Sequence, residues 1–127
     1  MSALPVKDQW AIITKDLKLP KNWQEKDLQQ AITSRLREHG FQARCEGGFQ
    51  GGYADIVTDW QDGTVIEIKK YLDRKRIYEA YGQLNLYCMG NDYKMVIAGF
   101  MHPFEQRKTR AIASMIERNP LVQVLFI

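Results

Sequence analysis

Apolar residues recur every three or four positions in the first third of the chain, which is the spacing of one face of an α-helix. Two such stripes are present: Trp10, Ile13 and Leu17, then Leu28, Ile32 and Leu36. We expect the first helix to end at Pro20, because proline lacks the amide hydrogen that a helix interior uses. In the second helix, Asn22 is the expected N-cap, Glu25 takes the capping-box position and Gly40 is the stop.

From residue 41 onward the pattern changes to short strands separated by turn residues and by two further helices. We expect strands from the segments FQARCE, YADIVT, TVIEIKK, YKMVIAG and LVQVLFI. The glycine-rich GGFQGG is expected to be a flexible connection, and DWQDG a turn. Helices are expected over roughly 73 to 89 and over PFEQRKTRAIASMIERN, where apolar residues again lie about one turn apart.

This order of elements predicts an α/β fold with a mixed central sheet flanked by helices. The short links between the first three strands favour an antiparallel meander. The helix between the third and fourth strands makes those two strands parallel. No linker, repeat or low-complexity tract divides residues 1–127, so we expect a single domain.

Composition restricts the function only mildly. Charged residues make up 26% of the chain and the net charge is +3, a surplus too small to indicate a nucleic-acid partner by itself. Cys45 and Cys88 form no CxxC pair, so we expect two reduced thiols rather than a zinc site. The N-terminus lacks the apolar core of a signal peptide, and no apolar run is long enough to span a membrane, which favours a cytoplasmic protein.

Charged residues interrupt the predicted hairpin formed by the second and third strands. Alternation along its second strand directs Ile66 and Ile68 towards a helix. Glu67 and Lys69 then share the opposite face. Eleven residues separate Asp55 from Glu67, with the turn midway between them, so the hairpin brings the two carboxylates side by side. Carboxylates this close need a shared proton, a lysine or a divalent cation between them.

Oxygen ligands without histidine favour Mg²⁺ or Mn²⁺, with water and a substrate phosphate completing the coordination shell. The main-chain carbonyl of Ile68 lies between the two charged side chains and is a further candidate ligand. Lys69 fits beside such a site as the group that positions or deprotonates the attacking water and stabilises the phosphorane charge. These residues predict metal-assisted hydrolysis of a phosphodiester. The structural alternative is a solvated ion pair on a sheet edge, which explains most arbitrary D…E-x-K matches.

Asp55 and Glu67-Ile68-Lys69, with a helix–strand unit before them and a helix after them, resemble the PD-(D/E)XK nuclease superfamily. That family includes type II restriction enzymes, Holliday-junction resolvases and lambda-type exonucleases. Its restriction-endonuclease-like core would cover about residues 24–99 here. The resemblance implies a Mg²⁺-dependent DNA nuclease in which Asp55 and Glu67 bind the metal and Lys69 assists the water nucleophile.

Other parts of the family pattern are matched less evenly. Gln83 and Tyr87 resemble the Q-x-x-x-Y element of the exonuclease-like and RecB-like branches, which orients the active site or contacts DNA. The structural alternative is that the two residues flank an apolar stripe and satisfy a buried hydrogen bond. Ala54 replaces the proline of the family name. The first-helix glutamate, often a further metal ligand, corresponds to Glu25, unless capping alone explains that residue. Counted back from REHGF, the resolvase-like position is Gln29, a poor ligand for a cation.

Basic residues that follow the third strand are the expected phosphate contacts. They are Lys70, Arg74, Lys75 and Arg76, with a second group of Arg107, Lys108 and Arg110 in the last helix. Phe49 and Gln50 of GGFQGG are expected to reach a groove of the duplex. Solvated helix faces are the alternative explanation for both basic groups.

We therefore expect a small DNA nuclease whose exonuclease or endonuclease action stays open, with a homodimer or larger homo-oligomer as one way to cut both strands. Two other classes of protein also fit the sequence. One is a non-catalytic nucleic-acid-binding or regulatory protein that retains the nuclease fold. The other is a structural protein in which Asp55, Glu67 and Lys69 form a satisfied ion-pair network.

Overall fold

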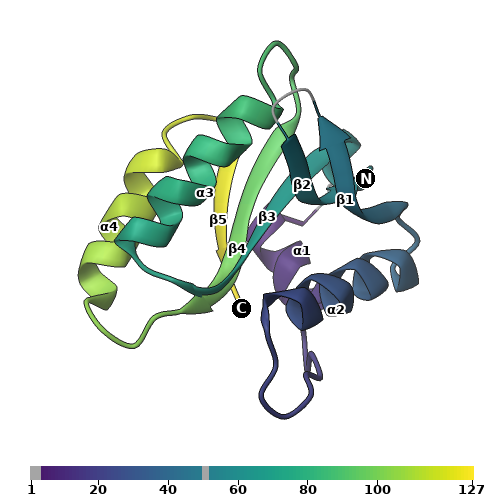
Figure 1. Ribbon diagram of the computed structural model, residues 1–127, viewed down its shortest axis with the longest axis horizontal. Coiled ribbons are helices and arrows are strands. Elements are labelled where there is room, and N and C mark those ends of the chain that lie inside the picture. The colour runs from purple at the N-terminus through teal and green to yellow at the C-terminus, as the bar shows by residue number, and fades with distance from the viewer. Residues whose placement is uncertain (1–3, 50–51) are drawn as a thin grey trace.

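A five-stranded mixed sheet with helices on both faces forms the structure (Figure 1), a computed structural model. It describes residues 4–49 and 52–127, with side chains described for 4–46 and 54–127. The elements are α1 (Val6–Ile13), α2 (Glu25–Glu38), β1 (Ala43–Phe49), β2 (Gly52–Thr58), a short 3₁₀ turn (Trp60–Asp62), β3 (Thr64–Leu72), α3 (Arg74–Tyr87), β4 (Lys94–Met101), α4 (Gln106–Ile116) and β5 (Val122–Phe126). Within the described part, no helix combines the length and the apolar character needed to cross a membrane.

The strands lie in the order β1-β2-β3-β4-β5. The first three are antiparallel to one another, β4 is parallel to β3, and β5 is parallel to β4. The predicted α/β class and the predicted strand directions are confirmed. Both parallel connections run through a helix, α3 or α4, as parallel neighbours require.

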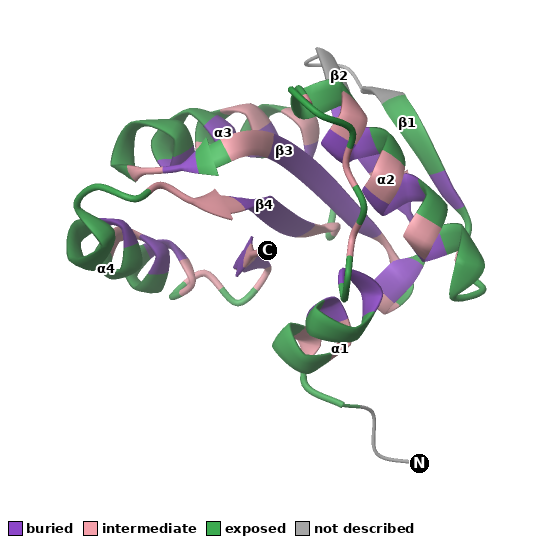
Figure 2. Ribbon diagram, turned by 90° about the horizontal axis from the view of Figure 1, so that it is seen from below, coloured by how far each residue is buried: buried purple, intermediate pink, exposed green. Residues whose placement is uncertain are grey.

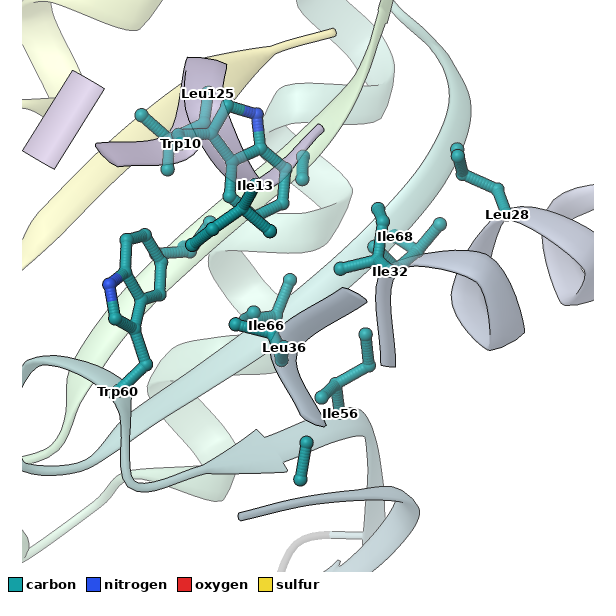
Figure 3. Packing of buried hydrophobic residues seen from close by; sticks show 13 residues of the cluster. Trp10, Ile13, Leu28, Ile32, Leu36, Ile56, Trp60, Ile66, Ile68 and Leu125 are labelled. Carbon is teal, nitrogen blue, oxygen red and sulfur yellow. The ribbon is translucent and has the colours of Figure 1, made fainter. Parts of the chain in front are cut away.

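Two hydrophobic cores fill the two sides of the sheet, with α1 and α2 on one side and α3 and α4 on the other (Figure 2). In the first core, side chains of α1 and α2 pack on Ile66 and Ile68 of β3 (Figure 3). In the second, Ile77 and Leu84 of α3 pack on Val65 of the same strand. Side chains along β3 therefore alternate between the cores, as the sequence pattern predicted.

The helix ends differ from the predictions. The first helix ends at Ile13 rather than at Pro20. The predicted capping by Asn22 and Glu25 is wrong, because Gln24 is the N-cap and its main-chain N–H donates to Asp27 Oδ2 at 2.8 Å.

The predicted connections on either side of the second strand also differ from the structure. In GGFQGG, Gly47–Phe49 continue β1 and Gly52 opens β2, so the strands extend further into this segment than expected. DWQDG contains a single 3₁₀ turn, in which Gln61 has the left-handed φ of 58°. The hairpin spacing is unaffected by either difference.

Strand β3 contains one extra residue opposite β4. Ile68 pairs with Ala98, but Tyr71 pairs with Phe100. The register shift is a β-bulge, and beyond it Leu72 belongs to the second core although unbroken alternation would direct it to the first. The bulge brings the carbonyl oxygen of Lys69 so close to Gly99 that a Cβ at Gly99 would clash with it.

Replacing Gly99 with alanine is expected to destabilise the fold by about 2 kcal/mol, because the bulge at Lys69 would have to move. Gly82→Ala is the matched control. Gly82 lies in α3 with open space around it, so alanine there should stabilise the helix by up to about 1 kcal/mol. Urea unfolding of both variants measures the two effects. A Gly99→Ala protein as stable as the native chain would show that this close approach is not required.

Candidate active site

The β2–β3 ladder ends just before the two carboxylates of the hairpin. Its last described pair is Ile56 with Ile66, and the same register continued would place Asp55 opposite Glu67. Strand β3 nevertheless stays paired with β4 as far as Leu72. Among the described residues, the segment of β3 from Glu67 to Leu72 is therefore paired on one side only, and we call its other side the free edge.

Two side chains form hydrogen bonds with main-chain groups that the β2–β3 ladder leaves unpaired. Asp55 Oδ2 accepts a hydrogen bond from the Ile68 N–H at 2.8 Å. The side chain of Gln29, on α2, donates through Nε2 to the carbonyl oxygen of Asp55 at 2.6 Å. Gln29 is buried. Both contacts satisfy groups that would otherwise be costly to bury, and together they hold Asp55 at the free edge.

Glu67 and Asp55 share a proton. Glu67 is only 5% exposed, and its Oε1 has no hydrogen-bond partner among the described residues. Burial first, and then the negative charge of Asp55, raise the pKa of Glu67 to about 8, so it stays protonated at neutral pH and hydrogen-bonds to Asp55. Burial also raises the pKa of Asp55, opposed by the Ile68 N–H and the Lys69 charge. The positive charge near the two carboxyl groups is therefore too small to keep both of them ionised at neutral pH.

Lys69 lies near this pair without touching it. Its positive charge lowers the pKa of both carboxyl groups. It is half-buried, yet it takes part in none of the ion pairs formed by the described residues. Asp55, Glu67 and Lys69 therefore do not form the satisfied ion-pair network of the structural alternative, and the ammonium group keeps its donors for another ligand.

Helix α3 brings Tyr87 to the carboxylates. Burial raises the pKa of Tyr87, and the charges of Glu67 and Asp55 raise it further, which places the phenol within electrostatic reach of the pair. Gln83 lies one turn earlier on α3, and its Oε1 is a buried oxygen without a hydrogen-bond partner in the described structure. The C-terminal half of α3 thus carries two polar groups beside the second core.

Glu25, an expected metal ligand, has surroundings unlike those of Asp55 and Glu67. Glu25 is exposed in the first turn of α2, one turn before Gln29. Within the described residues, no group of three His, Cys, Asp or Glu side chains is arranged to hold a metal ion. Ile68 contacts the pair through its N–H rather than through its carbonyl. The two carboxyl groups that interact directly at the free edge are Asp55 and Glu67.

Glu46 is a residue that sequence reasoning missed. The β1–β2 register places it opposite Asp55, between the pairs Cys45–Ile56 and Gly47–Ala54. Its φ is 55°, a left-handed value that interrupts the ladder, and its negative charge contributes to the raised pKa of Asp55. The only signal in the sequence is the double glycine that follows it, which the sequence pattern alone assigns to a flexible connection.

Of the expected phosphate contacts, Lys70 lies in β3, and Arg74, Lys75 and Arg76 lie at the other end of α3 from Tyr87. Lys70 Nζ donates to the carbonyl of Trp23 at 2.7 Å, Arg76 pairs with Asp73, and Lys75 is exposed. Arg74 to Tyr87 spans about 20 Å along the helix. Arg74, Lys75 and Arg76 are separated from Tyr87 by most of that length, whereas Lys70 lies on β3 only three residues from Glu67.

The remaining expected contacts are either engaged or not described. In the second basic group, Arg107 is exposed, Lys108 pairs with Glu105 and Arg110 lies over the ring of Phe126. Phe49 ends β1, but its side chain is not among those described, and Gln50 lies outside the described residues.

Comparisons of the chain with protein-family models, with curated proteins and with solved structures found no match. The chemistry of the site therefore has to be judged from its own geometry.

The raised pKa of Glu67 predicts how stability depends on pH in a metal-free buffer. Between about pH 4.5 and pH 8 the folded protein holds a proton that the unfolded chain releases, so Glu67 stabilises the fold at low pH and this contribution is lost as the pH rises through 8. Glu67→Gln removes the titration.

The free energy of unfolding of the native chain, minus that of Glu67→Gln, should fall with pH by at most about 1.4 kcal/mol per unit in this window. Urea titrations of both proteins in EDTA at several pH values measure it. A difference that stays constant from pH 5 to pH 8 would contradict the shared proton.

Proposed function

We propose that this chain is a metal-dependent nuclease of the PD-(D/E)XK type, with a restriction-endonuclease-like core, that hydrolyses DNA phosphodiester bonds. One observation carries the proposal. Two neighbouring carboxyl groups, the buried Glu67 and the half-buried Asp55, lie at the free edge of β3 with one oxygen unpartnered among the described residues and a nearby lysine that forms no ion pair there. A packed hairpin has no structural need for such an arrangement.

The donor set suits a hard divalent cation. Asp55 and Glu67 offer carboxylate oxygens, and Mg²⁺ typically uses one or two protein carboxylates and completes its shell with water and substrate phosphate. The orphan oxygen of Glu67 and the shared proton mark a place where positive charge is missing. Asp55 and Glu67 would hold Mg²⁺ or Mn²⁺, with the carbonyl of Ile68 as a further candidate ligand. The bound ion would supply charge neutralisation at the phosphate and a lowered pKa for an attacking water.

The roles of the other residues follow from their positions. Asp55 is held by the Ile68 N–H, so its remaining oxygen is oriented before substrate arrives. Lys69 would orient the attacking water and donate hydrogen bonds to the charge that develops on the phosphoryl oxygens. The phenol O–H of Tyr87 is a hydrogen-bond donor within electrostatic reach of the two carboxyl groups. The unpartnered Oε1 of Gln83 is suited to accept one from water.

A second candidate is a non-catalytic DNA-binding protein that retains the same core. The observation in its favour is Gln29, a neutral side chain where the family resemblance places an acid, and its amide is already engaged with the carbonyl of Asp55. A site with two acids binds a cation less strongly than one with three. The two candidates differ in whether bound DNA is cut.

Cleavage of end-labelled DNA in Mg²⁺, Mn²⁺ or EDTA tests the proposal, on supercoiled, blunt linear, single-stranded, flapped and four-way-junction substrates. We expect cleavage of at least one form that depends on the metal and falls about 100-fold or more in Lys69→Ala. Lys15→Ala, an exposed lysine just after α1, is the matched control and should cut normally.

Lys69→Ala should keep the native melting temperature within a few degrees, because the residue forms no ion pair in the described structure. Cleavage that survives in EDTA, or in Lys69→Ala, would contradict the assignment of the site. DNA that binds without being cut in any form would favour the non-catalytic candidate.

A further inference from the structure

Five aromatic side chains form a continuous row at the far end of β3 and β4. The distances between ring centroids are 5.2 Å from Phe100 to Trp23, 6.4 Å from Trp23 to Tyr71, 5.8 Å from Tyr71 to His102 and 5.5 Å from His102 to Phe104. We call this set the aromatic row. It lies on the α2 side of the sheet at its Phe100 end, where Trp23 and Phe100 pack against the first core.

Packing accounts for one end of the aromatic row but not for the other. Tyr71 is 39% exposed and Phe104 is 72% exposed. The main chain of Phe104 is anchored by its N–H, which donates to His102 Nδ1 at 3.1 Å, and the Phe104 ring contacts the His102 ring. Large aromatic side chains fixed at the surface are characteristic of a binding site rather than of a core.

The charge around the aromatic row favours an anionic partner. Lys70 Nζ lies 4.6 Å from the Trp23 ring centroid and 6.0 Å from that of Tyr71. Just beyond, Arg74 lies 5.8 Å from the ring of Tyr78, which is 47% exposed.

Two acidic groups close to the aromatic row in sequence form ion pairs. Asp73 pairs with Arg76, and Glu105 pairs with Lys108. Cations interleaved with exposed rings are the arrangement that binds single-stranded nucleic acid, since each base stacks on a ring while the phosphates meet the cations.

The free edge of β3 joins the aromatic row to the candidate active site. Glu67 and Tyr71 pair with residues three positions apart on β4, because the bulge takes up one residue, so they lie about 10 Å apart along the strand at the usual rise of ~3.3 Å per residue. Glu67 faces the α3 side of the sheet and Tyr71 the α2 side, so a single strand would contact both by passing across the free edge.

We propose that the aromatic row binds unpaired bases of single-stranded DNA, so that the substrates of this protein are DNA ends or tails that are at least partly single-stranded. Bases within a duplex already stack on each other, so only unpaired bases present a free face to Tyr71 and Phe104. The inference rests on the proposed nuclease function for its choice of DNA.

Fluorescence anisotropy in EDTA tests the inference without cleavage, using a labelled 12-nucleotide oligo-dT and a blunt duplex of the same length. The native chain should bind the single strand more tightly than the duplex. Phe104→Ala and Tyr71→Ala should each weaken single-strand binding about 5- to 150-fold, the usual range for loss of one stacked base. Tyr71→Phe keeps the ring and should bind nearly as well as the native chain.

Leu86→Ala is the control for loss of an exposed apolar side chain elsewhere, since Leu86 is 56% exposed on α3. It should leave binding unchanged. Phe104 is so exposed that its replacement should not unfold the protein, which a melting curve checks for each variant.

Equal binding of the two DNA forms, no binding of either, or equal effects of Leu86→Ala and Phe104→Ala would each overturn the inference. Its failure is distinguishable from that of the nuclease proposal. Metal-dependent cleavage without single-strand preference would support the nuclease proposal and contradict the single-strand inference. Single-strand binding through the aromatic row, with no cleavage in Mg²⁺ or Mn²⁺, would contradict the nuclease proposal and support the binding of bases by the aromatic row.

Discussion

The hydrogen bond from the Ile68 N–H to Asp55 Oδ2 is the contact on which the rest of the site depends. It lets β3 continue beyond the last pair with β2 without leaving a buried N–H unsatisfied, an omission that would cost about 1–3 kcal/mol. The same bond fixes a carboxylate beside Glu67. Gln29 completes the arrangement by donating a hydrogen bond to the Asp55 carbonyl. The contacts formed where β2 and β3 separate are therefore the same contacts that hold Asp55 beside Glu67.

That arrangement is electrostatically incomplete, which distinguishes it from ordinary packing. Two carboxyl groups share a proton beside an apolar core, and the nearest lysine influences both without pairing with either among the described residues. A protein selected only for stability would gain by replacing such a pair with apolar side chains. Perturbed carboxyl groups next to an uncommitted cation are instead typical of catalytic and ion-binding sites.

Local patterns were enough to anticipate part of this site. Strand alternation and the eleven-residue spacing led to the neighbouring positions of Asp55 and Glu67, and helical spacing placed Gln83 one turn from Tyr87. The rest depends on elements distant in sequence. The Gln29 contact requires α2 to be docked on the sheet, and the bulge at Lys69 requires a glycine on β4. The left-handed Glu46 has no local signature beyond the glycines that follow it.

Calorimetric titration of Mn²⁺ into the native chain near pH 7, in two buffers with different ionisation enthalpies, tests most directly whether Asp55 and Glu67 form a cation site. Because Glu67 is protonated there without metal, binding should release close to one proton, and Asp55→Asn should abolish it. Glu25→Gln should bind nearly as well as the native chain, because Glu25 is exposed and outside the pair. Binding without proton release, or an unchanged affinity in Asp55→Asn, would contradict the account.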